Sequence, residues 1–476
     1  MAGAGFPAER LIQIKAQDPG CGNHSAMDLE TLLAKYDRRV PRYTSYPTAP
    51  HFTPAIDAVR YSDWLHGLPD DAPLSLYLHV PFCARLCYFC ACHTTVVHRI
   101  EPLISYGQAM LAEIDLIAAA IGRRLPVQHV HWGGGTPSAL PADLMLAVMD
   151  RLRARFAFRP DAEIAIEVDP RELSAESLAA VGAMGATRAS LGVQDFDPAV
   201  QHAINRIQDY ALTAECAERL RGVGVDSINL DLVYGLPHQT VAGVRRTVEQ
   251  ALRIRPDRAA VFGYAHVPWM KKHQALLPEE ALPGAHERFA QRQAVEEVLV
   301  GHGYVPVGLD HFALPDDSLA RAAADARLKR NFQGYTTDDA PVLLGIGASS
   351  IGSLPQGYVQ NLPSVPAWRD AVRGGALPVA RGIALTAADR LRRAVIEQIM
   401  CRHEVDLRAV AASFGADPDG LMDAAPLLQE MQRDGLVQWD GYRVSVTPEG
   451  RPLVRSVAAA FDTYLQSGAG RHSAAV

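Results

Sequence analysis

The sequence of 476 residues lacks three features: a long apolar run, a basic leader segment and an excess of positive charge. No run approaches the roughly eighteen apolar residues of a membrane-spanning helix. The N-terminus has no basic region followed by an apolar block, so we expect no signal peptide. We therefore expect a cytoplasmic protein without a membrane partner, in a compartment where thiols stay reduced. The net charge of −7 argues against a nucleic-acid partner, because a polyanion requires a basic surface.

Cysteine is also scarce, with seven in the chain, but four of them fall within the segment VPFCARLCYFCAC (80–92). A disulfide is not expected where thiols stay reduced. A structural zinc site usually takes two well-separated pairs of ligands, whereas Cys83, Cys87 and Cys90 form one C-x3-C-x2-C unit. This spacing predicts a [4Fe–4S] cluster held by three thiolates, with one iron open for another ligand. Cys92 is the alternative fourth ligand. If the open iron must bind a substrate, Cys92 is expected to pack near the cluster without binding iron.

Segments with strand character alternate with helical stretches along the first part of the chain. This alternation predicts βα units around a parallel sheet, and six such units suggest an α/β protein with a full or partial (β/α) barrel. The expected strands are LSLYLHV (74–80), VQHVHWGGG (127–135), EIAIEVDP (163–170), ATRASLGVQDF (186–196), SINLDLVYGL (227–236) and RAAVFGYA (258–265).

We expect three parts in the chain: an N-terminal arm at 1–55, a catalytic barrel at 56–370 and a mostly helical C-terminal unit at 371–476. Residues 386–476 read as a separate unit of helices followed by a hairpin over 436–450 that turns at Asp440–Gly441, an order that resembles a winged helix. The last of these helices, PLLQEMQRDG (426–435), is nearly neutral, whereas a DNA-recognition helix is basic. A lid or scaffold is therefore the preferred role for this unit.

The expected strands are not uniformly apolar, as buried parallel strands usually are. Polar residues recur at every second position, for example Glu163 and Glu167 in the third strand and Asn229 and Asp231 in the fifth. With a period of two, one face of each strand meets the helices and the other faces the lumen. A polar lumen predicts a ligand chamber, which should open at the C-terminal ends of the strands. The cysteine segment and the segment GGGTP (133–137) both fall at that end.

These motifs carry a resemblance to a known family. The C-x3-C-x2-C unit after the first strand and the glycine-rich end of the second resemble the radical S-adenosylmethionine superfamily. Within it, the chain from about residue 30 to residue 468 is similar to the oxygen-independent coproporphyrinogen III oxidases (coproporphyrinogen dehydrogenases). The RYTSYPT arm distinguishes these from haem-chaperone-like relatives. The segments that carry the similarity include RYTSYPTAPHF (42–52), YLHVPFCARLCYFCAC (77–92), HWGGGTPSAL (131–140), NLDLVYGLPHQT (229–240) and LLGIGASSIG (343–352).

The resemblance implies specific roles for residues of this chain. Cys83, Cys87 and Cys90 would hold the cluster, and its open iron would bind one S-adenosylmethionine molecule. Tyr77, Gly134 and Glu167 would contact this first molecule. Of all the implied site residues, Tyr77, Glu167, Arg206 and Asp231 would take part in catalysis. Contacts with a second S-adenosylmethionine molecule are implied for Phe89, Gly135, Thr136, Gln194, Arg206, Asp231, Ala265 and Ile351.

The implied reaction is the oxidative decarboxylation of two propionate side chains of coproporphyrinogen III to vinyl groups, which gives protoporphyrinogen IX in anaerobic haem biosynthesis. A 5′-deoxyadenosyl radical made from S-adenosylmethionine at the cluster would abstract a hydrogen atom from each propionate. We expect a monomer that receives electrons from a donor such as flavodoxin or ferredoxin. One alternative is a haem-binding or haem-delivery paralogue without oxidase activity. A more distant one is a regulator with a cluster sensor.

A substrate with four carboxylates predicts cationic groups near the mouth of the chamber. Arg42 in the arm and the segment Lys271–Lys272–His273 after the sixth strand are the candidates. For the lysines a solvated turn is the preferred interpretation. For Arg42 a structural role and a functional role remain equally open.

Overall fold

A sheet of twelve strands forms the centre of the computed structural model, which describes residues 29–465. Its parallel part runs in the order β13-β1-β4-β5-β6-β7-β8. Six of these seven strands are those expected from the sequence. The parallel strands are β1 (Leu74–Val80), β4 (Pro126–Gly134), β5 (Ala157–Val168), β6 (Arg188–Gln194), β7 (Ser227–Tyr234), β8 (Arg258–Gly263) and β13 (Val342–Ile346).

Antiparallel strands extend the sheet at both edges, and β9 and β16 do not pair with each other. The sheet is therefore open, which confirms the prediction of a partial barrel. The strands beyond β13 are β14 (Ile351–Leu354), β15 (Gly357–Asn361) and β16 (Val379–Ala384). The strands beyond β8 are β10 (His311–Ala313) and β9 (Val305–Val307).

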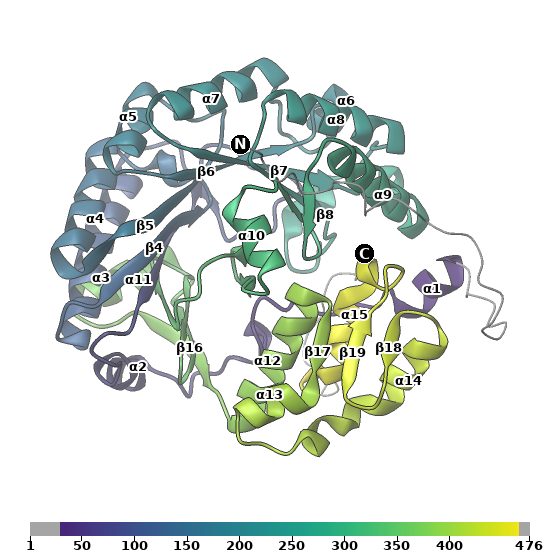
Figure 1. Ribbon diagram of the computed structural model, residues 1–476. Helices are drawn as coiled ribbons and strands as arrows, with labels where there is room; N and C mark the ends of the chain where they lie inside the picture. The colour runs from purple at the N-terminus through teal and green to yellow at the C-terminus, as the bar shows by residue number, and fades with distance from the viewer. Residues whose placement is uncertain (1–28, 466–476) are drawn as a thin grey trace, which may run out of the picture.

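The helices that connect the parallel strands form an arc outside the sheet, and the C-terminal unit lies across the open side of this arc (Figure 1). Side-chain caps fix several helix starts; Asp209 accepts from the N–H of Leu212, for example. The helices of this part are α2 (Ala58–His66), α3 (Glu101–Ile121), α4 (Ala142–Arg155), α5 (Ala175–Ala183), α6 (Pro198–Ala203), α7 (Tyr210–Gly222), α8 (Val241–Arg253), α9 (Ala285–Gly301), α10 (Ser318–Ala324) and α11 (Val365–Arg373).

The alternating sequence of the strands matches their burial. In β7, Ile228, Leu230 and Leu232 are almost fully buried and belong to the main hydrophobic core. Asn229 and Asp231 lie on the opposite face, where they contact polar groups of the neighbouring strand β6. The lumen of the partial barrel is thus polar, as the sequence predicts.

Helix α3 is long and apolar enough to cross a membrane by length and composition alone. It packs against the sheet as a core helix instead, with Met110, Ile114 and Ile121 fully buried in the main hydrophobic core. Buried core helices of this length are common in α/β proteins, so this helix carries no evidence of a membrane.

The C-terminal unit has its own hydrophobic core, which also takes in residues of the arm. Leu33 and Tyr36 of helix α1 (Leu29–Tyr36) and Tyr46 of the arm belong to this core. The expected hairpin is present as the last two strands of a small sheet. The elements of the unit are α12 (Ala387–Arg402), β17 (Glu404–Asp406), α13 (Leu407–Ser413), α14 (Ala425–Arg433), β18 (Val437–Trp439), β19 (Arg443–Val446) and α15 (Val454–Ala458).

The main sheet continues past residue 371, where the sequence places the start of the C-terminal unit. Strand β16 pairs with β15, and Gly382 also bridges to Thr53 of the arm. The capping box of Thr386 and Asp389 then starts helix α12. We therefore place the boundary near residue 385, because the proline- and glycine-rich segment before it forms part of the sheet. Residues 1–28 of the expected arm and residues 466–476 of the expected C-terminal unit lie outside the described residues.

Candidate active site

The cysteine segment is a loop between β1 and α3, and it is fixed to the glycine segment after β4. The short parallel strands β2 (Phe82–Cys83) and β3 (Thr95–Val96) tie the two ends of the loop together. The N–H of Thr136 donates to the carbonyl of Phe82 at 2.7 Å. A Cβ atom at Gly135 would lie 2.6 Å from the same carbonyl oxygen, so this close approach requires glycine.

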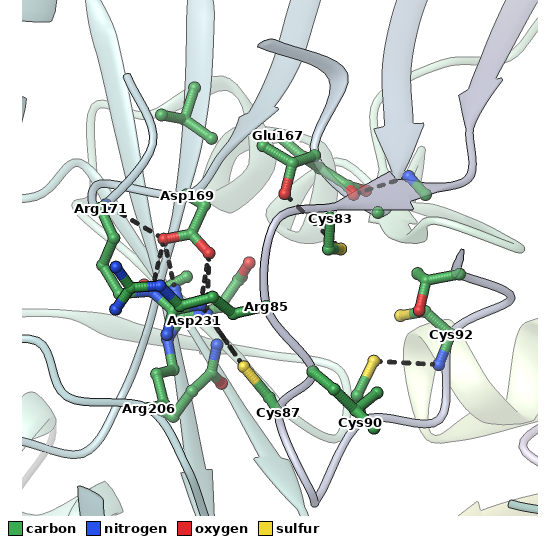
Figure 2. A pocket seen from close by; sticks show the side chains of 18 of the residues that line it. Cys83, Arg85, Cys87, Cys90, Cys92, Glu167, Asp169, Arg171, Arg206 and Asp231 are labelled. Carbon is green, nitrogen blue, oxygen red and sulfur yellow. Dashed lines mark hydrogen bonds and ion pairs between the residues drawn. The ribbon is translucent and has the colours of Figure 1, made fainter. Parts of the chain in front are cut away.

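The loop and the strand ends enclose a cavity of about 170 Å³ at the mouth of the lumen (Figure 2). Most of the site residues expected from the sequence line this cavity. They are Cys83, Cys87, Phe89, Cys90, Gly134, Gly135, Thr136, Glu167, Gln194, Arg206 and Asp231. Tyr77, Ala265 and Ile351 do not line it.

The thiols of the loop are suited to an iron–sulfur cluster rather than to a single metal ion. Within residues 29–465, no group of three or more His, Cys, Asp and Glu side chains converges closely enough to hold one metal ion, and no disulfide forms. The thiols of Cys83, Cys87 and Cys90 instead border the same cavity. In a [4Fe–4S] cluster each cysteine binds a different iron, so a wider arrangement is required.

Two arginines approach one of these thiols. Nη2 of Arg171 lies 3.4 Å from Cys87 Sγ, and Nη1 of Arg206 lies 3.6 Å from it. Thr136 Oγ1 lies 3.7 Å from Cys83 Sγ. Donors at these positions favour thiolates, which are the form of cysteine that binds iron. At Cys83 burial outweighs the contact with Thr136 and raises the pKa to about 11. The residues present therefore fit the cluster.

Asp169 holds both arginines in place. Its carboxylate accepts from Arg171 Nη2 at 2.7 Å and from Arg206 Nη1 at 3.2 Å, as Figure 2 shows. Burial alone would raise the pKa of Asp169, but the two guanidinium groups outweigh it and lower this pKa. Sequence reasoning did not assign Asp169 or Arg171 to the site. The signal was available, because the segment Asp169–Pro170–Arg171 directly follows β5 at the mouth of the barrel.

Glu167 connects the ends of β4 and β5. Its carboxylate accepts from the N–H of Gly134 at 3.0 Å and from His131 Nε2–H at 3.1 Å. Burial would raise the pKa of Glu167, but these two hydrogen bonds and the charge of His131 lower it below the ordinary value. A Cβ atom at Gly133 would lie 2.7 Å from Glu167 Oε1, so the glycine run leaves the space that this carboxylate fills.

Tyr77 is half-buried and contacts its neighbours beside the cavity without lining it. Its hydroxyl lies 2.9 Å from His79 Nδ1, and its ring stacks on that of His131 at 5.8 Å. His79 Nε2–H donates to the carbonyl of His93, so Nδ1 accepts from the tyrosine hydroxyl. Burial lowers the pKa of His79 to about 4, which keeps this imidazole neutral. Tyr77 and His79 thereby support both Glu167 and the loop.

Asp231 lies on the inner face of β7. Its carboxylate accepts from Ser190 Oγ and from Asn229 Nδ2, each at 2.8 Å. Burial raises the pKa of Asp231 to about 6, although these hydrogen bonds oppose the shift. Gln194 ends β6 in a left-handed conformation with φ of 71°, and its side chain borders the same cavity.

The segment after β8 holds the cysteine loop from its other side. Gln274 Nε2 donates to the carbonyls of Phe89, at 2.9 Å, and Ala265, at 3.2 Å. Lys271 Nζ donates to the carbonyl of Cys92 at 2.7 Å, and His273 Nε2–H donates to that of Cys90 at 2.7 Å. Ala265 is thus linked to the cysteine loop through Gln274, and Ile351 begins β14.

Comparisons with known proteins agree with this geometry. The profile of the Radical SAM superfamily matches residues 77–251, and that of the HemN C-terminal domain matches residues 385–453. An oxygen-independent coproporphyrinogen III oxidase of Bradyrhizobium diazoefficiens is 50% identical over 92% of this chain and 98% of its own length. One of Salmonella typhimurium is 40% identical over 92% of this chain and 96% of its own.

A solved structure is also similar over nearly the whole chain. The coproporphyrinogen III oxidase (HemN) of Escherichia coli, described as a radical SAM enzyme, superposes with a TM-score of 0.86 at 37% identity. The match covers 92% of this chain and 100% of that chain. The similarity thus extends over more than nine-tenths of this chain, at 37% identity or more in each of these comparisons. The chain therefore belongs to the oxygen-independent coproporphyrinogen III oxidase family of the radical SAM superfamily.

Proposed function

We propose that this protein converts coproporphyrinogen III to protoporphyrinogen IX without oxygen, in haem biosynthesis. The observation that carries the proposal is that the three-cysteine loop and the carboxylates of Glu167 and Asp231 border one cavity. Relatives named as oxygen-independent coproporphyrinogen III oxidases match more than nine-tenths of the chain.

Membership of the radical SAM superfamily implies a [4Fe–4S] cluster and S-adenosylmethionine. Cys83, Cys87 and Cys90 would hold one cluster, and Cys92 would remain outside the iron ligands. When bound, the cluster and S-adenosylmethionine supply a carbon radical strong enough to remove a hydrogen atom from the β-carbon of a propionate.

The inner-face residues would hold the first S-adenosylmethionine molecule beside the loop. The hydrogen bonds from Gly134 and His131 keep Glu167 ionised, so its carboxylate can accept from cationic or hydroxyl groups of this molecule. The backbone at Gly134 approaches closely because no side chain intervenes. Tyr77, which is half-buried, would contact the same molecule and would also support this carboxylate through the ring of His131.

A second S-adenosylmethionine molecule would lie toward β6 and β7. Each propionate loses one hydrogen atom, one carbon dioxide and one electron, so two propionates need two molecules of S-adenosylmethionine and an external electron acceptor. Gln194 and Asp231 offer hydrogen-bonding groups to the second molecule. Arg206 would face its carboxylate while Asp169 holds the guanidinium group. Phe89, Gly135 and Thr136 border the same cavity. Ala265 and Ile351 would complete the contacts with this second molecule.

Exclusion of water is the expected task of the arm and the C-terminal unit, because a carbon radical reacts with any C–H bond within reach. The arm is fixed between these parts: Thr53 pairs with Gly382 of the sheet, and Tyr43 Oη donates to Asp462 at 3.0 Å. We propose that the protein works as a monomer and receives electrons from a donor such as flavodoxin or ferredoxin.

The test is an anaerobic assay of the reconstituted protein with coproporphyrinogen III, S-adenosylmethionine and a reductant. Formation of protoporphyrinogen IX is the expected result. Tight haem binding without conversion of the substrate would contradict the proposal and favour the haem-delivery alternative. A cluster-free variant such as Cys83→Ala serves as the inactive control.

A further inference from the structure

Four arginine side chains from distant parts of the chain gather beyond the ends of β7 and β8. Arg42 Nη2 donates to the carbonyl of Gly263, the last residue of β8, at 3.1 Å. Arg288, in the first turn of α9, donates to the next carbonyl, that of Tyr264, at 3.2 Å. We call Arg42, Arg288, Arg330 and Arg455 the arginine cluster.

The other two members of the arginine cluster reach the same place from the opposite side. Arg330 lies on β11 (Lys329–Asn331), and its Nε donates to the carbonyl of Arg42 at 3.3 Å. Arg455 of α15 donates through Nε to the carbonyl of Pro41 at 3.1 Å. The arm is therefore held between the barrel and the C-terminal unit by guanidinium groups.

One carboxylate accompanies the four guanidinium groups. Asp310 Oδ1 lies 3.9 Å from Arg330 Nη1 and accepts from His311 Nδ1–H at 2.7 Å. Burial would raise the pKa of Asp310, but Arg330, His311 and Arg42 lower it to about 2. This carboxylate is thus fully ionised and still leaves an excess of positive charge in the cluster.

Parts of the cluster have no protein partner for their hydrogen bonds. Arg288 Nε and Arg330 Nη1 are buried without a hydrogen-bond acceptor in the described part of the chain. Arg42 keeps an exposed side chain, yet burial and the charges of Arg330 and Arg288 lower its pKa. The accessible guanidinium group of Arg42 thus lies near two others, those of Arg330 and Arg288. Like charges held together at an accessible position favour an anion between them.

The cluster also adjoins the candidate active site. Asp231 on β7 and His311 on β10 pair with the same residue of the strand between them, Ala260 of β8. His311 in turn donates to Asp310, the carboxylate that pairs with Arg330 of the arginine cluster. An anionic substrate that reaches Asp231 would therefore meet the arginines at its other end.

We infer that the arginine cluster is a carboxylate subsite, in which Arg42, Arg288 and Arg330 bind the propionates that the reaction leaves unchanged. Arg455 is a positioning residue that holds the arm so that Arg42 faces the substrate. The inference rests on the proposed function, because a substrate with four carboxylates retains two of them in the product. Arginine suits this role, since its planar group binds a carboxylate through two parallel hydrogen bonds.

The experiment compares the holoenzyme with its Arg42→Gln and Arg330→Gln variants. Binding of coproporphyrin III, the coloured oxidised form of the substrate, and of its tetramethyl ester is followed by fluorescence. Each variant should bind the tetraacid at least about tenfold more weakly, as expected for the loss of a hydrogen bond to a charged group. Binding of the uncharged ester should not change. KM for coproporphyrinogen III should rise more than kcat falls.

Arg159→Gln is the matched control, because Arg159 is an exposed arginine near the start of β5 that pairs with Asp161. It removes the same charge and should leave both affinities unchanged. Arg42→Gln tests the subsite without disturbing the core, since the Arg42 side chain is exposed. Unchanged tetraacid binding in both cluster variants, or equal weakening for acid and ester, would overturn the inference. A wild-type protein that binds coproporphyrin through these arginines but converts no substrate would instead contradict only the proposed function.

Discussion

The backbone N–H of Gly134 donates a hydrogen bond of 3.0 Å to Glu167 Oε2 and so joins the mouth ends of β4 and β5. His131 donates to the other carboxylate oxygen at 3.1 Å. Both contacts favour the ionised form of Glu167, which lies at the cavity beside the cysteine loop. A fixed anion at this position suits a ligand that carries positive charge.

Replacing Glu167 by glutamine should weaken S-adenosylmethionine binding about tenfold or more while the cluster remains, because a charge-assisted hydrogen bond is lost. Isothermal titration of the reconstituted protein measures the affinity, and iron analysis measures the cluster. Glu163→Gln is the matched control. Glu163 lies on the same face of β5 but pairs with Arg188 and His129 away from the cavity. Its substitution should lower thermal stability and leave the affinity unchanged.

The cysteine loop supports a prediction about the cluster ligands. Alanine at Cys83, Cys87 or Cys90 should each abolish the oxygen-sensitive [4Fe–4S] cluster, because each thiolate binds its own iron. Serine at Cys92 should preserve it, with reduced activity if this residue supports the site from outside the ligand set. Iron and sulfide determination after reconstitution checks both statements. A full complement of iron in Cys83→Ala, or none in Cys92→Ser, would refute the assignment.

Much of this site follows from local patterns in the sequence. The period-two alternation in β5 and β7 correctly places Glu167 and Asp231 on the lumen face, since side chains of a strand alternate between its faces. The C-x3-C-x2-C spacing and the glycine run correctly meet at the mouth, because both directly follow parallel strands.

Long-range pairing explains what the sequence did not reveal. Strand β13 lies beside β1 although more than 250 residues separate them, and Gly345 within it weakens its strand pattern. Asp169 and Arg206 belong to different βα units, so their ion pair depends on how the loops after β5 and β6 pack. Tyr77 has the expected orientation toward the lumen and stacks on the ring of His131, but it does not border the cavity. No local pattern records how far a side chain reaches into the lumen.

Asp231→Asn tests the second S-adenosylmethionine molecule. The variant should keep the cluster and one bound molecule but lose the other, since asparagine removes the charge and one acceptor from this wall of the cavity. Equilibrium dialysis gives the number of molecules bound. If the wild-type protein binds only one molecule at saturation, a single site must be refilled between the two steps.

The same variant makes a prediction about pH. The folded pKa of Asp231, about 6, lies above the ordinary value of 3.8, so its contribution to stability is fully present below pH 3.8 and is lost as the pH rises through 6. This difference of about two pKa units corresponds to a change of at most roughly 3 kcal/mol in the free energy of unfolding. Relative to wild type, the apo form of Asp231→Asn should therefore gain stability between pH 4 and pH 8, measured by urea unfolding. A pH-independent difference would contradict this account of the carboxylate.

The most direct measurement follows hydrogen from substrate to cofactor product. Coproporphyrinogen III deuterated at the β-carbons of its propionates is incubated anaerobically with the reconstituted protein, S-adenosylmethionine and a reductant. We predict deuterium in 5′-deoxyadenosine, with two molecules of 5′-deoxyadenosine and two of carbon dioxide for each protoporphyrinogen IX. Unlabelled 5′-deoxyadenosine without vinyl product would contradict the central claim that this site oxidises propionate side chains.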